Sequence, residues 1–411
     1  MVAPKTFGSW MAKMSLLQAP ASVAATNKAA YTEYTVTAIE ALQNWYNEEE
    51  GLWNTTGWWN SANCLAVLGD FSALEADETH RMDIEDIFAI TFTQAQQSTQ
   101  TARRSRMRGL STLLVGTQHA KSPVFSNTTL PPRSSINSSS TLTNRGYSGF
   151  INDYYDDEGW WALAWIRAYD VTSKLEYLKM AESIFADMQG GVNGTCGGGI
   201  FWSKDRTYKN AIANELYFTV AASLANRATE ADSYLSIAKS QWSWFKHSGL
   251  INEDNLVNDG LTINANGTCT NNGETVWSYN QGVIIGGLVE LYDATGNSDL
   301  LSEASSIASA AIEALSEDGI LHDECEPDCG IDGSQFKGVF VRNLHYLQVV
   351  APRDEFRTFI LDNADSIWKN DRNSTNYLGV VWSGPPSAGG LPDAGTQSSA
   401  IDALIAAMAV V

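Results

Sequence analysis

The chain has 411 residues, enough to bury a large core, and its length alone would allow two or three domains. Acidic residues outnumber basic ones 47 to 26, and the formal charge of −21 works against partners such as nucleic acid or an anionic bilayer surface. Neutral partners fit that charge, and the 14 Trp and 15 Tyr suit either a neutral polysaccharide or a stiff aromatic core.

The first 24 residues differ in composition from the rest of the chain. They hold only a short Met-Ser-Leu-Leu patch and small residues, a poor core for a secretory signal, and we interpret them as an N-terminal leader or extension. Residues 25–411 are predicted to form a single domain, because the helical patterns on both sides of its one long irregular stretch look alike. No run of about 18 apolar residues occurs, so no membrane span is expected.

Helical periodicity dominates the domain, and alternating strand patterns are short wherever they occur. Twelve helices joined by alternately short and long loops predict six helical hairpins that close into an all-α (α/α)6 barrel. The predicted helices are Ala25–Asn47, Trp58–Val67, Glu78–Thr93, Asp156–Asp170, Ser173–Met188, Tyr208–Arg227, Ala231–His247, Thr275–Ala294, Ser298–Leu315, Phe336–Val350, Arg353–Lys369 and Thr396–Val410.

One stretch between these helices behaves differently. Residues 96–147 are rich in Ser and Thr, carry seven basic residues in an otherwise acidic chain and show little apolar periodicity. We predict a basic insertion that leaves the domain as a surface excursion. Contact with an anionic cell-surface component and an error in the gene model are the alternatives.

Every second predicted helix is preceded by a loop rich in Gly, Trp or Asn and opens with aromatic and amide side chains. These helix starts would converge on one end of the barrel, where polar groups can line a wet cavity. The alternative is that Asn and Gln at these positions only cap their helices. The repeated segments are Gly57–Asn63, Gly159–Trp161, Tyr208–Glu215, Trp277–Gly282, Gln335–Gly338 and Asp393–Gln397.

The most informative segment runs from Tyr154 to Trp165 and contains two adjacent aspartates among aromatic residues. Asp156 and Asp157 lie at a predicted helix start, where backbone N–H groups and the helix dipole favour carboxylates. Glycoside hydrolysis needs such a pair, one nucleophile or base and one protonated acid. Neighbours in sequence favour the ~5–5.5 Å separation of retaining enzymes. A helix cap followed by core aromatics is the competing interpretation.

Other catalytic classes have less support in the sequence. The Gly-x-Ser-x-Gly and His-Glu-x-x-His motifs are absent, and the five histidines are scattered without metal-ligand spacing. The run Gly197–Gly199 lacks the Lys-Ser/Thr of a phosphate loop, and the aspartate pair lacks the D-x-D-x-D spacing of a calcium loop. We therefore expect no metal and no cofactor.

The cysteines and glycosylation sequons bear on the compartment. Five cysteines are present. Cys64 lies in an apolar run and is predicted to be free and buried, whereas the other four lie in loop-like sequence and allow up to two disulfides. Six N-x-S/T sequons fall mostly in predicted loops, as in secreted glycoproteins. They begin at Asn54, Asn127, Asn137, Asn193, Asn266 and Asn373.

From about residue 30 onward the chain resembles glycoside hydrolase family 76, the α-1,6-mannanases, and in particular its fungal cell-wall branch. The order of the matching motifs is more specific than the aspartate pair alone. The motifs are Tyr154–Ile166, Gly57–Asn63, Gly197–Trp202, Lys209–Glu215, Tyr279–Gly282 and Phe336–Gly338.

The resemblance implies an (α/α)6 barrel that acts as a retaining endo-α-1,6-mannosidase on α-1,6-mannan or a related mannose-containing glycan. It implies that Asp156 is the nucleophile and Asp157 the general acid/base. The pattern of helix starts adds a set of expected substrate contacts. These are Trp59, Asn210, Asn214, Tyr279, Gln281 and Lys337.

Two alternatives to hydrolysis stay open. A cell-wall transglycosidase acting on GPI-linked mannose glycans would use the same covalent intermediate, and a catalytically silent mannan-binding protein would keep only the aromatic groove. The chain's last residues look like a core helix without the tail of a GPI signal, whereas fungal relatives are thought to be membrane-anchored. We expect a secreted or cell-wall-associated, N-glycosylated monomer.

Overall fold

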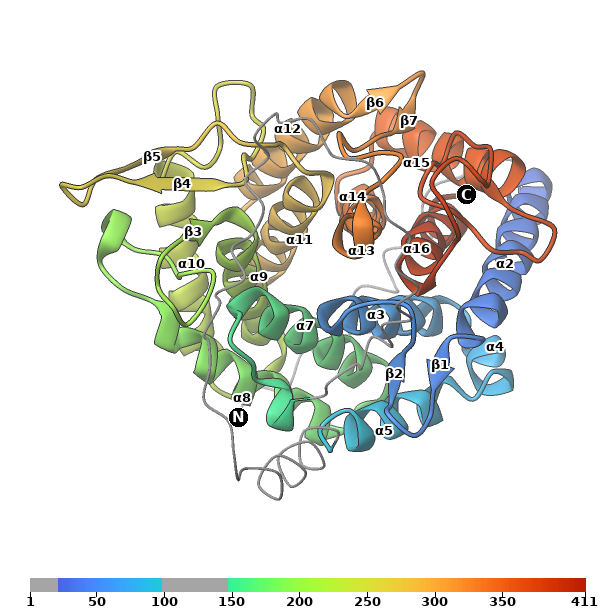
Figure 1. Cartoon of the computed structure of the whole chain (residues 1–411), viewed down its shortest axis with the longest axis horizontal. Coiled ribbons are helices and arrows are strands. Elements are labelled where there is room, and N and C mark those ends of the chain that lie inside the picture. Colours follow the sequence, from blue (N-terminus) through green and yellow to red (C-terminus); the bar gives the residue numbers. More distant parts are fainter. Residues whose placement is uncertain (1–20, 98–146) are drawn as a thin grey trace, which may run out of the picture.

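The computed structural model describes residues 21–97 and 147–411, with side chains from residue 27 onward. Most of the expected leader, most of the expected basic insertion, and the sequons at Asn127 and Asn137 lie outside the described residues. The described part is built from two concentric rings of helices, drawn end-on in Figure 1.

Six helices form the inner ring. Each packs against the next inner helix along the chain, and the last packs against the first, which closes the barrel (Figure 1). The predicted (α/α)6 architecture is therefore confirmed. The inner helices are α3 (Trp58–Leu74), α7 (Tyr155–Thr172), α9 (Ala211–Arg227), α11 (Ser278–Thr295), α14 (Phe336–Val350) and α16 (Ala394–Val410).

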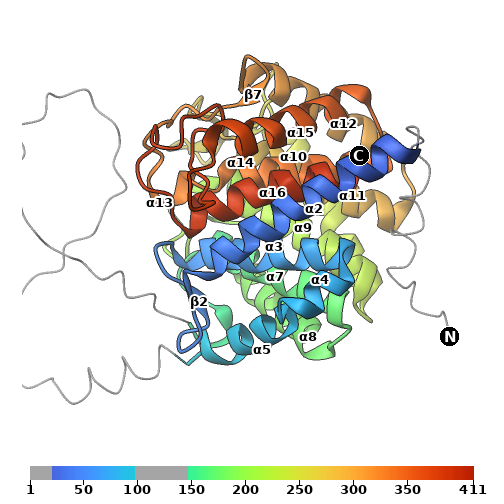
Figure 2. The ribbon, with the colours of Figure 1, turned by 90° about the vertical axis from the view of Figure 1, so that its right-hand side faces the viewer.

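The outer ring covers the inner one, as in the side view of Figure 2, where α2 lies along α16. The outer helices are α2 (Ala21–Gln43), α4 (Ala76–Arg81), α5 (Ile84–Gln94), α8 (Leu175–Met188), α10 (Ala231–His247), α12 (Asp299–Ala314) and α15 (Asp354–Ser366). Short helical turns lie in the connections, namely η1 (Ser148–Phe150), η2 (Gln189–Gly191), η3 (Thr195–Gly197), α13 (Gly330–Gly333) and the π-helical η4 (Ile367–Asp371).

Side-chain burial separates the two rings. In α8 the buried residues recur every three or four positions, so one stripe faces the barrel and the rest faces solvent. In α16 nearly every residue is buried, because the helix packs on both inner neighbours and on the outer ring. The side chains on all sides of an inner helix must therefore be apolar or have polar partners within the protein.

Small antiparallel sheets decorate the loops. They pair β1 (Tyr46–Asn47) with β2 (Leu52–Trp53), order β3 (Lys209–Asn210), β4 (Gly260–Ile263) and β5 (Cys269–Asn271) in one sheet, and pair β6 (Ser316–Glu317) with β7 (Ile320–Leu321). Disulfides join Cys196 to Cys269 and Cys325 to Cys329, while Cys64 is free and buried. Both expectations about the cysteines are confirmed.

Several helix boundaries differ from the predicted ones for local reasons. The helix expected over 78–93 is broken at Asp83, whose φ of 51° is left-handed. The helix expected from Tyr208 starts at Ala211, because Lys209 and Asn210 pair with β4. The helix expected from Thr275 starts at Ser278, whose backbone N–H and hydroxyl both donate to Asp323.

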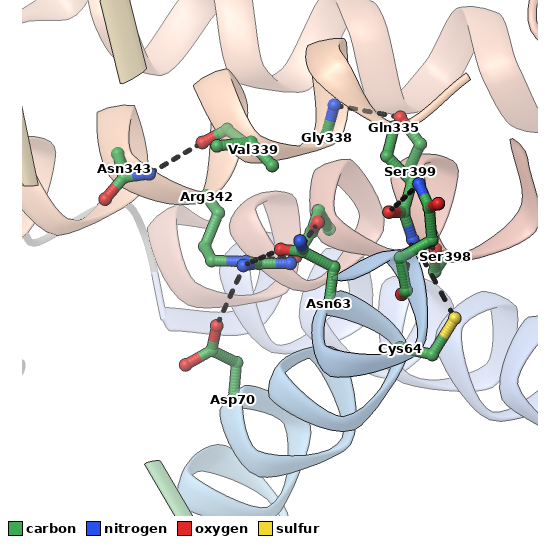
Figure 3. Close-up of polar contacts among 12 residues, drawn as sticks. Asn63, Cys64, Asp70, Gln335, Gly338, Val339, Arg342, Asn343, Ser398 and Ser399 are labelled. Carbon is green, nitrogen blue, oxygen red and sulfur yellow. Dashed lines mark hydrogen bonds and ion pairs between the residues drawn. The ribbon is translucent and has the colours of Figure 1, made fainter. Parts of the chain in front are cut away.

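Ion pairs cross the inside of the barrel beyond the first turns of the inner helices. Three arginines on inner helices pair there with carboxylates of the same ring. Figure 3 shows one of them, Arg342 of α14, reaching Asn63 and Asp70 of α3. The ion pairs are Arg167 with Asp70 and Asp170, Arg227 with Asp170 and Glu290, and Arg342 with Asp70 and Asp402.

Across the residues that the structure describes, no helix combines the length and apolarity needed to cross a bilayer.

Candidate active site

Four aromatic rings from four inner helices meet at the end of the barrel where those helices begin. Tyr279 stacks on Phe336 with ring centroids 3.9 Å apart, and Trp59 stacks on Trp160 at 5.4 Å. Trp160 and Tyr279 are nearly parallel at 6.5 Å, which joins the two pairs. We call these four rings the aromatic floor. Trp59 and Tyr279 keep part of their surface exposed, so the floor offers flat apolar area to a ligand.

The aspartate pair lies directly above this floor, in the first turn of α7. Trp160 follows Asp156 by four residues and Asp157 by three, so all three side chains share the helix face that points into the barrel. Both carboxylates are partly accessible. This placement brings the expected carboxylates and an aromatic surface to one barrel end.

Asp156 receives two hydrogen bonds. The indole Nε1 of Trp202 donates to its Oδ2 over 2.8 Å, and the backbone N–H of Asp157 donates to its Oδ1 over 3.0 Å. Trp202 lies in the loop after Gly199. The backbone N–H of Tyr155 donates to the Trp202 carbonyl and holds this loop beside the start of α7. Donors of this kind favour the ionised form of a carboxyl group.

Asp157 has a different donor. The amide Nδ2 of Asn152 donates to Asp157 Oδ2 over 2.6 Å. Asn152 lies just before the helix and is largely buried. Each carboxylate of the pair is therefore held by its own neutral side chain, Trp202 for Asp156 and Asn152 for Asp157.

Burial and mutual repulsion both push protons onto the pair. Burial raises the pKa of Asp156 to about 7, against the opposing effect of the Trp202 hydrogen bond. Burial, followed by the charge of Asp156, raises the pKa of Asp157 well above its usual range. Two neighbouring carboxyls with raised pKa values hold one proton between them near neutral pH, which is the state an acid/nucleophile pair needs.

A third acidic residue acts on the pair from the opposite side of the barrel mouth. The charge of Asp332 in α13 raises the pKa of both Asp156 and Asp157. Asp332 is exposed, and its Oδ1 accepts from Trp59 Nε1 over 2.8 Å. The negative charge around the pair disfavours anionic ligands and leaves neutral ones.

Two of the expected substrate contacts, Asn214 and Gln281, form hydrogen bonds with backbone groups of neighbouring loops. The Asn214 amide clasps both backbone groups of Ile200, accepting from its N–H over 2.8 Å and donating to its carbonyl over 2.9 Å. The Gln281 amide clasps Val257 in the same way, at 2.8 Å in both directions. Both amides are fully buried. In this structure their polar atoms are therefore already used by the loops.

Lys337 and Asn210, two further expected substrate contacts, also have partners within the protein. Lys337 is buried, forms an ion pair with Glu326 over 2.7 Å and donates to the Val380 carbonyl. Asn210 caps α9 by accepting from the backbone N–H of Ala213. The capping alternative thus describes Asn210, whereas Trp59 and Tyr279 lie in the floor beside the carboxylates and stay candidates for substrate contact.

Four site residues are not identified by sequence reasoning. Trp202 and Trp160 lie inside conspicuous motifs, but nothing in their spacing links them to an aspartate. Asn152 precedes the helix by three residues, a position that suggests only a turn. Asp332 approaches from another inner-helix start, a proximity that only the closed barrel provides. Within the described segments, no group of three or more His, Cys, Asp or Glu side chains is arranged to hold a metal ion.

Comparison with known proteins gives the class and then the family. The barrel shares its fold with solved glycoside hydrolases, and the chain is a glycoside hydrolase. The model of Glycosyl hydrolase family 76 matches residues 136–410, and the chain belongs to that family.

Curated relatives carry one type of activity in their names. A putative mannan endo-1,6-α-mannosidase of Schizosaccharomyces pombe is 32% identical over 214 residues, which are 48% of this chain and 48% of that protein. The mannan endo-1,6-α-mannosidase DFG5 of Saccharomyces cerevisiae is 29% identical over 273 residues, which are 61% of this chain and 58% of that protein. The matched regions thus span about half of those relatives' lengths.

Solved structures show the same fold. An inactive variant of the α-1,6-mannanase GH76A of Salegentibacter sp. HEL1_6, with two adjacent aspartates replaced by asparagine and α-1,6-mannotriose bound, superposes with a TM-score of 0.72 at 23% identity. The match covers 93% of this chain and 100% of that one. Dfg5 of Chaetomium thermophilum in complex with glucosamine gives a TM-score of 0.68 at 18% identity, covering 92% and 90%.

Proposed function

We propose that the chain is a retaining endo-α-1,6-mannosidase that hydrolyses α-1,6-linked mannan through a covalent glycosyl-aspartate. The observation that carries the proposal is the aspartate pair above the aromatic floor, with Trp202 bound to one carboxylate and Asn152 to the other. The names of the family relatives support the substrate, and the acidic mouth favours a neutral sugar over an anionic one.

In the first step Asp156 attacks the anomeric carbon while Asp157 gives its proton to the departing glycosidic oxygen. This breaks the bond between sugars and forms an ester between the mannosyl unit and Asp156. In the second step Asp157, now ionised, takes a proton from water, whose oxygen attacks the anomeric carbon and releases Asp156. Two displacements at one carbon leave the product with the α configuration of the substrate.

The surroundings of the two carboxyl groups support these two roles. Asp156 must be ionised to attack, and the Trp202 indole and the Asp157 backbone N–H both favour its charge. Asp157 must start protonated, and burial together with the neighbouring charge of Asp156 raises its pKa in that direction. Once Asp156 has become an ester its charge is gone, so Asp157 loses its proton more readily and serves as the base.

The test is digestion of α-1,6-mannan followed by measurement of reducing ends. Release by the wild type that disappears in Asp156→Asn, with Asp254→Asn as an exposed control on a surface loop, is the expected result. Binding of mannan without release would leave only a mannan-binding protein. Longer products with an added sugar acceptor would identify a transglycosidase, and a first-formed β-anomer in the NMR spectrum would overturn retention.

The proposal extends to a secreted or cell-wall-associated, N-glycosylated protein. Two disulfides suit an oxidising compartment, and the sequon residues Asn54 and Asn266 are exposed. Treatment of the protein from its native host with an N-glycan-removing enzyme should increase its mobility in a gel. Unchanged mobility would contradict the glycosylation.

A further inference from the structure

Asn152 does more than pack against Asp157, the proposed acid/base, because its side-chain amide forms a hydrogen bond at each end. Its Nδ2 lies 2.6 Å from Asp157 Oδ2, and its Oδ1 accepts the backbone N–H of Tyr154 over 2.8 Å. A backbone N–H can only donate, so the oxygen of the amide must face Tyr154. The NH₂ group therefore faces Asp157, and the direction of that hydrogen bond is fixed by the backbone.

This direction distinguishes the two oxygens of Asp157. The oxygen that receives an N–H is the acceptor, and in a protonated carboxyl the carbonyl oxygen accepts better than the hydroxyl oxygen. Oδ2 of Asp157 is thus held as the acceptor, which leaves Oδ1 as the oxygen that can carry the proton.

A buried ionic cluster holds Asn152 in place. The backbone N–H of Asn152 donates to Glu158 Oε1 over 3.2 Å, and Glu158 is fully buried. Lys204 binds the same oxygen over 2.9 Å and reaches Asp187 over 2.8 Å. The backbone N–H of Lys204 also donates to the Asp153 carbonyl, so the segment before α7 is fastened at two points.

We propose that Asn152 is a positioning residue that keeps the transferable proton of Asp157 on Oδ1 and stabilises the carboxylate left after transfer. This rests on the proposed function, in which Asp157 is the acid/base. Asn152 itself touches neither substrate nor leaving group in this assignment. Its effect on catalysis runs through Asp157 alone.

Two variants distinguish the role of the Asn152 amide as a donor to Asp157 from its role as an acceptor in the turn before α7. Asn152→Asp keeps an oxygen that can accept the Tyr154 N–H but replaces the donor to Asp157 with a second acceptor, whereas Asn152→Ala removes both. Asn297→Ala is the matched control, because Asn297 makes the same type of turn bond, to the backbone N–H of Asp299, at the start of outer helix α12. Thermal unfolding of all variants checks that they fold.

The activity test uses aryl α-1,6-mannobiosides with a poor leaving group, phenol, and a good one, 2,4-dinitrophenol. Loss of acid assistance should lower kcat/KM about tenfold or more for the phenyl substrate and much less for the dinitrophenyl substrate, which needs no proton. The basic limb of the pH profile should move up by on the order of one pH unit, because a donor that favoured the charge is gone. Equal losses on both substrates with an unmoved basic limb would reduce Asn152 to a structural role.

A measurement without substrate keeps the two proposals apart. In protein labelled with ¹³Cγ-aspartate, the Asp157 resonance is identified by its absence from Asp157→Asn, and its titration should move to higher pH in both Asn152 variants but not in Asn297→Ala. An unmoved titration overturns the inference even if mannan is cleaved. A moved titration in a protein that cleaves no mannoside supports the positioning role while the proposed function fails.

Discussion

The indole of Trp202 and the carboxylate of Asp156 are joined by a 2.8 Å hydrogen bond although 46 residues separate them in the sequence. The connection exists because the loop before β3 pairs with the segment that starts α7, through the Tyr155 N–H and the Trp202 carbonyl. A loop that contains no carboxylate of the pair therefore favours the charged form of Asp156, the proposed nucleophile.

Replacing Trp202 with Phe keeps a ring but removes this donor. A hydrogen bond to a charged group is worth about 1.5–3 kcal/mol, so we expect kcat/KM on α-1,6-mannan to fall about 10- to 100-fold. The acid limb of the pH profile should move upward, because the ionised form of Asp156 loses support. Trp244→Phe is the control, since its indole donates to the Cys196 carbonyl on the same loop. If the acid limb lies at the same pH in Trp202→Phe and Trp244→Phe, the Trp202 indole does not support the charge of Asp156.

The aspartate pair should cost the protein stability at neutral pH. The folded pKa of Asp156 is about 7, above its usual value near 3.8, so the folded state binds more protons than the unfolded state between these values. Stability is then fully present below about pH 4 and is lost as pH rises through 7. Asp156→Asn removes this loss, and we expect it to raise the free energy of unfolding at pH 8 by about 1–2 kcal/mol, allowing for partial access of water.

Denaturant unfolding at pH 4.5 and pH 8 measures this effect. The gain should be small at the lower pH, and Asp254→Asn, an exposed carboxylate, should show no gain at either. A variant that is less stable than the wild type at pH 8 would show that the Asp156 carboxylate stabilises the fold.

Asp332 should set the working pH of the site from across the mouth. Its charge raises the pKa of both members of the pair, so Asp332→Asn should lower both values. We expect the acid and basic limbs of the kcat/KM profile to move together toward lower pH, while the maximal value of kcat/KM changes little. A substitution that lowers the maximum without moving either limb would assign Asp332 to substrate binding alone.

We predict that Lys337 stabilises the fold and does not bind substrate. Lys337→Met leaves Glu326 buried without its partner, and breaking a buried ion pair in this way costs about 3–5 kcal/mol. The double change Glu326→Gln with Lys337→Met should recover part of that loss, because position 326 then carries no charge. Urea unfolding compares the variants, and KM for mannan in the folded protein should stay within about twofold. A raised KM with normal stability would restore Lys337 as a substrate contact.

Much of the barrel follows from sequence periodicity, since an inner helix and its outer partner each need an apolar face and short loops make them neighbours. The bounds of α10 and α14 match the prediction residue for residue, because residues that end helices follow each of them, Ser248 and Gly249 after α10 and Pro352 after α14. Periodicity does not reveal the break at Asp83, since a single left-handed residue leaves the apolar pattern on both sides intact.

The candidate site can be predicted from the sequence to a smaller extent than the fold. The aspartate pair can be found from the sequence because two carboxylates in an aromatic run are visible in one segment. The amides at the inner-helix starts look alike in sequence whether they meet a ligand or a loop. Only the fold decides that Asn214 clasps Ile200 and that Asn152 meets Asp157.

The ion pairs inside the barrel form one chain of contacts that includes a residue from every inner helix, running from Asp402 through Arg342, Asp70, Arg167, Asp170 and Arg227 to Glu290. Breaking a buried ion pair is costly, because it leaves a charge without its partner. The mutual placement of the inner helices, and with it the shape of the barrel mouth, therefore depends on charged residues that lie away from the mouth.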